Sequence, residues 1–532
     1  MSVIATADNS QRLVSALQQA EAYPHTVEAI TLFETHISWV LLTGEYVYKI
    51  KKPVDFGFLD FSTLEKRRFY CEEELRINRR LAPQLYLDVV PVCGSPDTPH
   101  IDGTGTVFEY AVKMRQFDPQ KTFDELLAHN ALTLPIIDET AAVIAGFHQQ
   151  IAIAGTNTHF GTPDAIAQPV LENFEQLEQT LADTTNADDI HKACKALRRW
   201  SQAQCEKLRV TFQHRKRAGF IRECHGDLHL RNIVLCNNQV IPFDGIEFNA
   251  NLRWIDVMSE LAFLLMDLDD HQQKKLSRQL LNRYLSLTGD YTGLATLRFY
   301  QVYRAMVRAK VASLRLAQIS GTPQTNETKN SLAEIHNYIQ LARDYTQPSP
   351  VNLVITHGLS GSGKSYLARQ LALNADLIHL RSDVERKRLF GLGETDHSDS
   401  LIDSGIYQQD ATRATYKRLC TLAEACINGG FSVIVDATFL QHSQRNLFHS
   451  LAQRLKCHFR ILNCQTKTTI MRQRIQQRAQ QGTDASEADL QVLEKQLSKQ
   501  QSLNSDEKKH VLDVDTSAEI NIPAVLGQLT LV

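Results

Sequence analysis

The chain of 532 residues is too long for one hydrophobic core, and its length predicts several folding units. A content of 43% hydrophobic and 22% charged residues is ordinary for a globular protein, and the net charge of −3 excludes a general electrostatic attraction to nucleic acid or anionic membranes. Because apolar runs of membrane-spanning length, a secretory signal and CxxC pairs among the ten cysteines are all missing from the sequence, we expect a cytoplasmic protein with reduced thiols.

The first predicted elements form a small antiparallel sheet with one inserted helix. Five short apolar runs predict strands at Glu28–Glu34, Ile37–Thr43, Tyr46–Lys52, Tyr86–Gly94 and Thr106–Phe117. The segment Ser62–Leu81 predicts a helix, since Ser62 or Thr63 can cap its start and Pro83 stops it. Short basic clusters such as Lys49–Lys52 are typical of solvated faces, so nucleic acid is not expected as a partner.

A mostly helical region follows from Phe117 to about Asp344. Short strands around Asn232–Leu235 and Val240–Phe243 interrupt it. Long amphipathic segments predict helices at Leu132–Ala152, Pro169–Leu181, His191–Arg215, Asp256–Leu287 and Thr296–Ala342, the last broken near "SGTPQTNET".

The proline-containing stretch Asp344–Asn352 is the predicted linker between two domains. We place the first domain at 1–345, with a sheet lobe at about 28–117 and a helical lobe at 118–345, the linker at 346–351 and the second domain at 352–532. In the second domain, strands alternate with helices, which predicts an α/β fold with a parallel sheet. Its strands are predicted at Asn352–His357, Leu377–Ser382, Phe431–Ala437, His458–Cys464 and His510–Asp515.

A phosphate-binding loop is predicted at "GLSGSGKS", which fits G-x-x-x-x-G-K-[ST] and lies between an apolar strand and a helix. Glycines let backbone N–H groups surround a phosphate, Lys364 would reach the β- and γ-phosphates, and the Ser365 hydroxyl would bind Mg²⁺. The alternative is a glycine-rich turn. The residues expected to bind the nucleotide are Gly358, Ser360, Gly361, Ser362, Gly363, Lys364 and Ser365.

Four further residues of the second domain are candidates for phosphoryl transfer. Asp436 ends a buried strand and would bind Mg²⁺ or its water shell; Ala437 follows it, which favours transfer over bare hydrolysis. Asp383 lies just past a strand, where α/β sheets bind ligands, and it would serve the acceptor hydroxyl or cap a helix. Arg474 and Arg478 share a helical face and would close over the transferring group, unless they form a solvated face.

The stretch "CHGDLHLRNIVL" is the strongest candidate in the first domain, because it holds H-x-D-x-x-x-x-N. In kinase-like folds this spacing places an aspartate (Asp227) at the acceptor hydroxyl and an asparagine (Asn232) at Mg²⁺, and His225 would shape the loop. Asp244 in "VIPFDGIEF" follows a short strand and precedes a glycine, as expected for a second Mg²⁺ ligand.

A lysine on the third strand and a helical glutamate should complete this site. Lys49 and Lys51 share a strand face, because side chains alternate with period two, and we favour Lys49. On the helix Glu74 points with the apolar stripe and is favoured, while Glu73 stays an alternative. Solvated side chains are the ordinary explanation for each residue alone; their order along the chain supports them together.

The second domain resembles small P-loop kinases related to zeta toxins, chloramphenicol phosphotransferase and the kinase half of polynucleotide kinase. The resemblance covers about 351–515 and rests on "GLSGSGKS", "RSDVERKR", "IVDATF" with Arg445 after it, and "RQRIQQRAQQGTDASEAD". It implies that Asp383 serves the acceptor hydroxyl and that Arg474 and Arg478 belong to a lid.

The first domain resembles the aminoglycoside phosphotransferase family, with its protein-kinase-like α+β fold, from about Glu28 to Asp344. "VYKIKK", "AGFHQQIA", "CHGDLHLRNIVL" and "IPFDGIEF" carry the match. The resemblance implies an ATP hinge near Lys113–Phe117, with Met114 in the nucleotide site.

The whole chain is similar to bacterial proteins that fuse these two domains. We therefore expect an ATP- and Mg²⁺-dependent phosphotransferase with two nucleotide sites, each transferring a γ-phosphate to the hydroxyl of a small molecule. The alternatives are that one domain only senses nucleotide, or that the protein phosphorylates nucleic-acid ends.

Overall fold

The computed structural model describes residues 2–57, 59–181, 188–319, 326–394, 396, 408–481, 486 and 489–529. The chain packs into two compact units. One contains residues 1–139, 146–169 and 212–267, and the other contains 140–145, 170–211 and 268–532. Among the helices of the described residues, none is long and apolar enough to cross a lipid bilayer. The predicted domain boundaries stay predictions.

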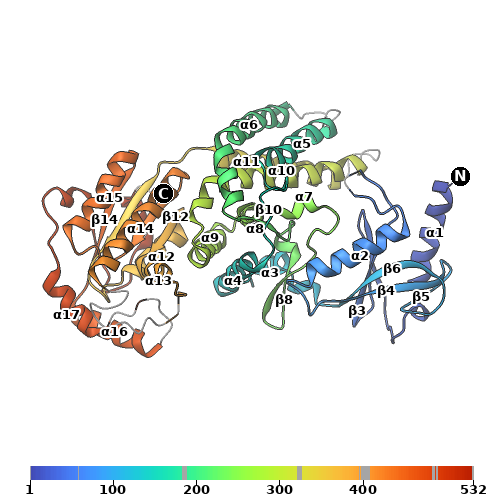
Figure 1. The fold of residues 1–532 in the computed structure, drawn as a ribbon, viewed down its shortest axis with the longest axis horizontal. Helices are drawn as coiled ribbons and strands as arrows, with labels where there is room; N and C mark the ends of the chain where they lie inside the picture. Colours follow the sequence, from blue (N-terminus) through green and yellow to red (C-terminus); the bar gives the residue numbers. More distant parts are fainter. Residues whose placement is uncertain are drawn as a thin grey trace. The chain divides into compact units, whose positions relative to one another are not determined.

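The first unit contains an antiparallel sheet with the strand order β1-β2-β3-β6-β4-β5. Its strands are β1 Thr31–Glu34, β2 Ser38–Leu42, β3 Tyr46–Lys51, β4 Tyr86–Ser95, β5 Thr98–Ile101 and β6 Val107–Arg115. Helix α2 (Leu64–Asn78) packs on β4 and β6 (Figure 1). Thr63 caps α2 by accepting a hydrogen bond from the Lys66 N–H, as the sequence predicts.

Alternation along β3 sorts its side chains between two cores. Tyr48 and Ile50 join one hydrophobic cluster with Trp39, while Val47 joins a second cluster that also contains Val112. Because every second residue of a strand shares a face, Lys49 and Lys51 lie on the face of Val47. The structure therefore points both predicted lysines toward the interior.

Helices and short hairpins make up the rest of the chain before the second unit's sheet. A type I′ turn joins β8 and β9, because Asn237 and Asn238 both take the left-handed φ values, 51° and 61°, that this turn requires. The further elements are α1 Ser2–Ala16, η1 Ala20–Ala22, η2 Pro119–Lys121, α3 Phe123–Ala128, α4 Leu134–Gln150, α5 Pro163–Leu181, α6 Asp188–Arg217, β7 Ile221–Glu223, η3 Leu230–Asn232, β8 Ile233–Cys236, β9 Gln239–Pro242, α7 Ala250–Arg253, β10 Trp254–Asp256, α8 Val257–Asp270, α9 Lys274–Thr288, η4 Tyr291–Gly293, α10 Leu294–Ile319 and α11 Asn326–Thr346.

Two predicted helix bounds are wrong. The single helix expected at Asp256–Leu287 is α8 followed by α9, because the chain reverses at Gln272 with a φ of 60°. The Gln273 N–H then donates a hydrogen bond to the Leu268 carbonyl at 2.8 Å, and this bond ends α8. Gln272 thus takes the left-handed conformation that glycine usually takes after the end of a helix. Helix α5 begins at Pro163, and Pro169 lies inside it. The break expected near "SGTPQTNET" falls on 320–325, outside the described residues.

The second unit holds a five-stranded parallel sheet in the order β12-β13-β11-β14-β15. Leu367 and Leu371 of α12 share a core with α18, and α14 and α15 also pack on the sheet (Figure 1). The predicted α/β fold with a parallel sheet is confirmed. Its elements are β11 Asn352–His357, α12 Lys364–Asn374, β12 Leu377–Arg381, α13 Ser382–Leu389, α14 Gln409–Asn428, β13 Ser432–Asp436, α15 His442–Leu455, β14 His458–Gln465, α16 Thr468–Gln481, α17 Leu490–Lys499, η6 Glu507–His510, β15 Val511–Asp515 and α18 Ile522–Gln528.

A buried ion pair offers a test of the first unit. The Arg215 Nε and Nη2 atoms donate to the Asp256 carboxylate at 2.7 and 2.8 Å, and the Arg215 side chain is 1% exposed. We expect Arg215→Ala to lower the free energy of unfolding by about 3–5 kcal/mol, because it leaves a buried carboxylate without its partner. Urea denaturation followed by circular dichroism measures this change. Arg217→Ala at the exposed end of α6 is the control; equal losses in both variants would contradict the prediction.

Candidate active sites

The loop between β7 and β8 brings the predicted catalytic residue Asp227 and the predicted Mg²⁺ ligand Asn232 together. The Asn232 Nδ2 atom donates to the backbone oxygen of Asp227 at 2.9 Å and to its carboxylate at 3.0 Å. The Asp227 side chain is 38% exposed, so it is held by the loop and still reachable by a substrate. The His229 ring lies 3.4 Å from the same carboxylate, a contact that the sequence did not predict.

The His225 ring ties this loop to the end of β9. Its Nε2 atom lies 2.8 Å from the Phe243 carbonyl, and its Nδ1 atom lies 3.3 Å from the Asp227 N–H. Burial lowers the pKa of His225, against the opposing charge of Glu260. A neutral ring that donates from Nε2 and accepts at Nδ1 satisfies both contacts. His225 therefore shapes the loop, as the sequence predicts.

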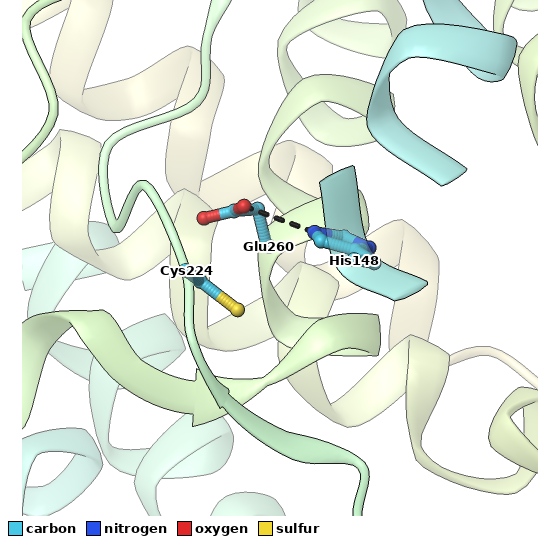
Figure 2. A group of neighbouring side chains, drawn as sticks. All are labelled: His148, Cys224 and Glu260. Carbon is cyan, nitrogen blue, oxygen red and sulfur yellow. Dashed lines mark hydrogen bonds and ion pairs between the residues drawn. The ribbon is translucent and has the colours of Figure 1, made fainter. Parts of the chain in front are cut away.

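A buried glutamate that the sequence did not reveal supports the same loop. One carboxylate oxygen of Glu260 accepts from the His225 N–H at 3.1 Å, and the other accepts from the Gly226 N–H at 2.7 Å. Figure 2 shows the His148 ring joined to this carboxylate, with Cys224 beside them, at a His148 Nε2 to Glu260 Oε1 distance of 3.0 Å. These three side chains have the composition of a metal site. Because both Glu260 oxygens already accept backbone hydrogen bonds, we interpret the cluster as a support for the loop.

The charge of Glu260 makes this support dependent on pH. Burial alone would raise the pKa of Glu260, but the His148 contact and the backbone N–H groups lower it to about 2 from 4.5. Because the folded-state pKa is depressed, the stabilisation is fully present above about pH 4.5 and is lost as the pH falls toward 2.

We expect Glu260→Gln to lower the free energy of unfolding at neutral pH by roughly 3 kcal/mol, from the size of the pKa shift. The difference from the wild type should be smaller at about pH 3.5 than at pH 7, because at pH 3.5 the unfolded chain binds a proton at Glu260 while the folded chain does not. Urea denaturation at both pH values measures it. Glu206→Gln, whose side chain is 76% exposed, is the control. A difference that does not change with pH would contradict the role of the charge.

Lys49 joins the predicted glutamate to the predicted metal-binding aspartate. Its Nζ atom lies 2.8 Å from Glu74 Oε1 and 2.6 Å from Asp244 Oδ1. Burial opposes the charge of Lys49, but the two carboxylates raise its pKa well above the ordinary value. Asp244 takes a φ of 61°, held by hydrogen bonds from its own N–H to the Tyr86 hydroxyl and from the Gly245 N–H to Asn78. Such a backbone outlier is typical of functional sites.

Lys51 binds the second oxygen of the same glutamate. Its Nζ atom lies 2.7 Å from Glu74 Oε2, and it also contacts Glu247. Both Lys51 and Glu74 are fully buried, whereas Glu73 pairs with Arg76 on the surface of α2. The structure thus brings Glu74 to both lysines, and of the two lysines Lys49 contacts Asp244.

We expect the two lysines to respond differently to substitution by methionine. Lys51→Met should lower the free energy of unfolding by roughly 3 kcal/mol, because Glu74 and Glu247 lose a buried counter-ion. In a chain whose P-loop site is disabled by Lys364→Ala, Lys49→Met should lower ATP turnover about 100-fold, because the kinase-like site loses the cation that contacts Asp244 and would bind phosphate. Thermal unfolding and ATP turnover measure the two effects, with the exposed Lys121→Met as the control. Full activity in Lys49→Met would contradict this assignment.

Met114, a predicted nucleotide-binding residue, lies in a hydrophobic cluster and not among the ion pairs of Lys49 and Lys51. It lies on β6 opposite Val47 and Tyr86 and is 7% exposed in a hydrophobic cluster. Its contact with a nucleotide stays a prediction.

The predicted phosphate loop lies between β11 and α12. Gly358, Gly361 and Gly363 have φ values of 142°, 79° and 84°, which side chains other than glycine rarely adopt. A Cβ atom at Gly361 would lie 2.6 Å from the Met471 carbonyl, so this loop also needs glycine for space. Lys364 Nζ donates to the Leu359 carbonyl at 2.7 Å, and burial lowers its pKa. The loop therefore has the curled form that surrounds a phosphate.

A cavity of about 1340 Å³ surrounds this loop. It brings together most residues that the sequence predicted for the second site: Ser360, Gly361, Gly363, Lys364, Ser365, Asp383, Asp436, Arg474 and Arg478. Gly358 and Ser362 do not line it, and the buried Ser362 hydroxyl has no hydrogen-bond partner among the described residues. Gln496 of α17 lies in the wall and accepts a hydrogen bond from the Ser360 N–H at 2.8 Å, a contact that the sequence did not predict.

The carboxylates of this cavity differ in their surroundings. Asp436 ends β13, and His379 Nε2 lies 3.3 Å from its carboxylate. Burial would raise the pKa of Asp436, but His379 and nearby cations lower it. Asp383 lies in the first turn of α13, whose N-cap is Arg381, so the alternative that Asp383 caps this helix is wrong.

Two of the arginines on α16 have different partners. Arg474 Nη2 donates to the Thr516 carbonyl at 2.6 Å, and Nη1 donates to the Gly361 carbonyl at 3.4 Å. Arg474 is thereby attached to the phosphate loop, which argues against a solvated face. Arg472 instead pairs with Glu494 at the surface. Arg445, part of the sequence resemblance, is buried against Glu507 at 2.7 Å outside the cavity lining.

Comparison with known families gives two matches. Residues 46–300 match the family described as "Phosphotransferase enzyme family", and residues 353–503 match the family described as "AAA domain". The uncharacterized protein Rv2004c of Mycobacterium tuberculosis is 30% identical over 468 residues, which cover 88% of this chain and 90% of that protein. The uncharacterized protein Mb2027c of Mycobacterium bovis matches with the same identity and coverage.

Solved structures resemble each part of the chain. An ethanolamine kinase of Plasmodium vivax matches with a TM-score of 0.36 and 9% identity, covering 60% of this chain and 84% of that one. A choline/ethanolamine kinase family protein of Mesorhizobium loti has a TM-score of 0.36 and 10% identity, with coverage of 64% and 99%. The APS kinase CysC of Mycobacterium tuberculosis has a TM-score of 0.25 and 19% identity, with coverage of 34% and 99%.

Proposed function

Since the chain belongs to the family of two-domain proteins that join a phosphotransferase domain to a P-loop domain, we propose that it phosphorylates small-molecule hydroxyl groups at two sites. The matches confirm the predicted fusion and the expected class of enzyme, a kinase-type phosphotransferase. In the proposal ATP is the donor at both sites. The acceptor hydroxyl attacks the γ-phosphorus, the bond from phosphorus to the bridging oxygen breaks, and ADP leaves with the electron pair.

At the kinase-like site, we assign the acceptor hydroxyl to Asp227. Its carboxylate is partly exposed and is oriented by Asn232 and His229, so it can accept the proton that the hydroxyl loses. Lys49, fixed by Glu74, would bind the phosphates of the nucleotide.

At the P-loop site, Asp383 has the corresponding role. It lines the same cavity as Lys364, and its helix begins directly after β12, at the carboxyl edge of the sheet. Lys364, Arg474 and Arg478 would bind the phosphates and the negative charge that develops during transfer.

The donor groups at both sites fit magnesium. Asp244 and Asn232 supply a carboxylate and an amide oxygen in the kinase-like site, since the Asn232 nitrogen makes the bonds to Asp227. Asp436 and the Ser365 hydroxyl supply oxygens in the P-loop cavity. These are the oxygen ligands that Mg²⁺ prefers, and a bound ion would neutralise phosphate charge during transfer.

The observation that carries the proposal is that each site holds its own complete set of charged groups. In the first unit Lys49 connects Glu74 with Asp244 near Asp227, and in the second unit one cavity gathers Lys364, Asp436 and Asp383. A domain that had lost its catalytic role would not need to keep an acceptor carboxylate beside its nucleotide-binding groups.

Two single variants and their combination test whether both sites act. We expect Asp227→Asn to remove the activity of the kinase-like site by at least about 100-fold, because the hydroxyl loses its proton acceptor. Lys364→Ala should remove nucleotide binding at the P-loop. Labelled-ATP transfer to a panel of sugars, amino alcohols and nucleosides measures the activities, and a fluorescent ATP analogue measures how many nucleotides bind.

Each variant should abolish transfer to a different set of acceptors, and the double variant should transfer to none. Loss of all transfer in one single variant, with no change in the other, would contradict the proposal of two active sites. Asp489→Asn, at a cavity-lining residue whose side chain caps α17 at 2.8 Å from the Val492 N–H, is the control for a change of charge without a catalytic role.

A further inference from the structure

The wall of the P-loop cavity beside Asp383 carries an excess of positive charge. Lysine and arginine side chains outnumber carboxylates among the described residues that line this cavity. Lys364, Arg474 and Arg478 are accounted for by the nucleotide in the proposed reaction. Others line the wall formed by α13 and α14, which pack against each other. The nucleotide phosphates therefore do not explain the whole excess.

Glu385 and Glu394, two carboxylates next to this wall, do not neutralise the cations of α14 that line the cavity. Glu385 of α13 is buried, and it is bound by Arg418 at 2.6 Å and by Arg388, neither of which lines the cavity. Glu394 holds Arg381 at 2.7 Å, so that cavity-lining arginine is already paired. Glu385 and Glu394 are thus bound by arginines other than the cavity-lining cations of α14.

Arg413 and Lys417 are the cations of α14 that line the cavity. Both side chains are exposed, and neither has a carboxylate partner in the part of the chain that the structure describes. They stand four residues apart on one helical face, where like charges repel each other. Arg386 follows Asp383 by three residues on α13, so the two share a face, and both line the cavity. An anion beside α14 would relieve this repulsion, and the walls of a cleft strengthen the attraction.

We propose that the acceptor of the P-loop site carries an anionic group, a phosphate or a carboxylate, that Arg413 and Lys417 bind with the help of Arg386. The proposal rests on the proposed phosphoryl transfer at this site. The acceptor hydroxyl faces Asp383 and the anionic group faces α14. The hydroxyl oxygen forms the new bond to the γ-phosphorus, its proton passes to Asp383, and ADP departs with the electrons of the broken bond.

Anion binding to the nucleotide-saturated protein tests this proposal. The full chain is first saturated with a non-hydrolysable ATP analogue and Mg²⁺, which fills the nucleotide sites, and inorganic pyrophosphate is then titrated by calorimetry. We expect binding that weakens at least about tenfold in Arg413→Ala/Lys417→Ala, because charged hydrogen bonds of this kind contribute that much affinity. Lys508→Ala/Lys509→Ala removes two exposed charges outside the cavity and should bind pyrophosphate as the wild type does.

Matched acceptors give the second measurement. In the Asp227→Asn chain, transfer is compared for glycerol and glycerol 3-phosphate, glucose and gluconate, and a nucleoside and its monophosphate. We expect transfer to the anionic member of a pair, with its KM raised at least about tenfold by Arg413→Ala/Lys417→Ala and kcat changed less.

The outcomes separate the two proposals. If Lys364→Ala does not reduce nucleotide binding, the proposed P-loop function fails, and the anionic acceptor fails with it. If nucleotide binds but pyrophosphate does not, or binds equally to all variants, the anionic acceptor alone is overturned. Preference for the neutral member of each pair, or transfer to oligonucleotide ends and to no small anion, would overturn it as well.

Discussion

Two lysines on β3, one largely buried and one fully buried, set the constraint on which the kinase-like part of the chain depends. A buried ammonium group is stable only with anionic partners, and Lys49 and Lys51 both find them in Glu74 of α2. Their other partners, Asp244 and Glu247, follow β9 nearly two hundred residues later. Because each lysine needs partners from both segments, the charges fix the sheet, α2 and the loop after β9 in one arrangement. The ion pairs that set the geometry of the site therefore also stabilise the fold.

The catalytic loop has a separate support of the same physical kind. The Glu260 carboxylate accepts from two successive backbone N–H groups and keeps its charge in the interior with the help of His148. The ion pairs of Lys49 and Lys51 hold the side of Asp244, and Glu260 holds the loop that carries Asp227. In the P-loop unit, glycines rather than ion pairs fix the shape of the loop, because the loop curves at positions where a side chain would not fit. The Lys364 side chain folds over this loop and donates to the Leu359 carbonyl.

Local sequence patterns predicted the positions of residues wherever the spacing within one strand, helix or loop determines them. Strand alternation placed Lys49 and Lys51 on one face, the apolar stripe favoured Glu74, and glycine spacing located the phosphate loop. Residues whose partners are distant in sequence were missed: Glu260, His148 and Gln496 act through contacts that no local period encodes. Gln272, just after the end of α8, takes a left-handed conformation that glycine usually adopts, so the sequence contains no glycine that would have marked this helix end. Strand β5 and helix α1 were also not predicted. The role of Met114 and the domain boundaries stay predictions.

The charges of the two sites give the proposed reactions a chemical order. In the kinase-like site the carboxylate assigned to the acceptor, Asp227, is partly exposed, and a carboxylate at that position disfavours an acceptor that is already anionic. Arg413 and Lys417 line the P-loop cavity, and their positive charges favour an anionic acceptor. Phosphorylation of a neutral alcohol yields a phosphate ester, and an ester that keeps a second hydroxyl belongs to the acceptor class proposed for the P-loop site. If both sites act on one molecule, the proposed acceptors favour the order in which the kinase-like transfer comes first, because its product carries the anionic group that Arg413 and Lys417 are proposed to bind.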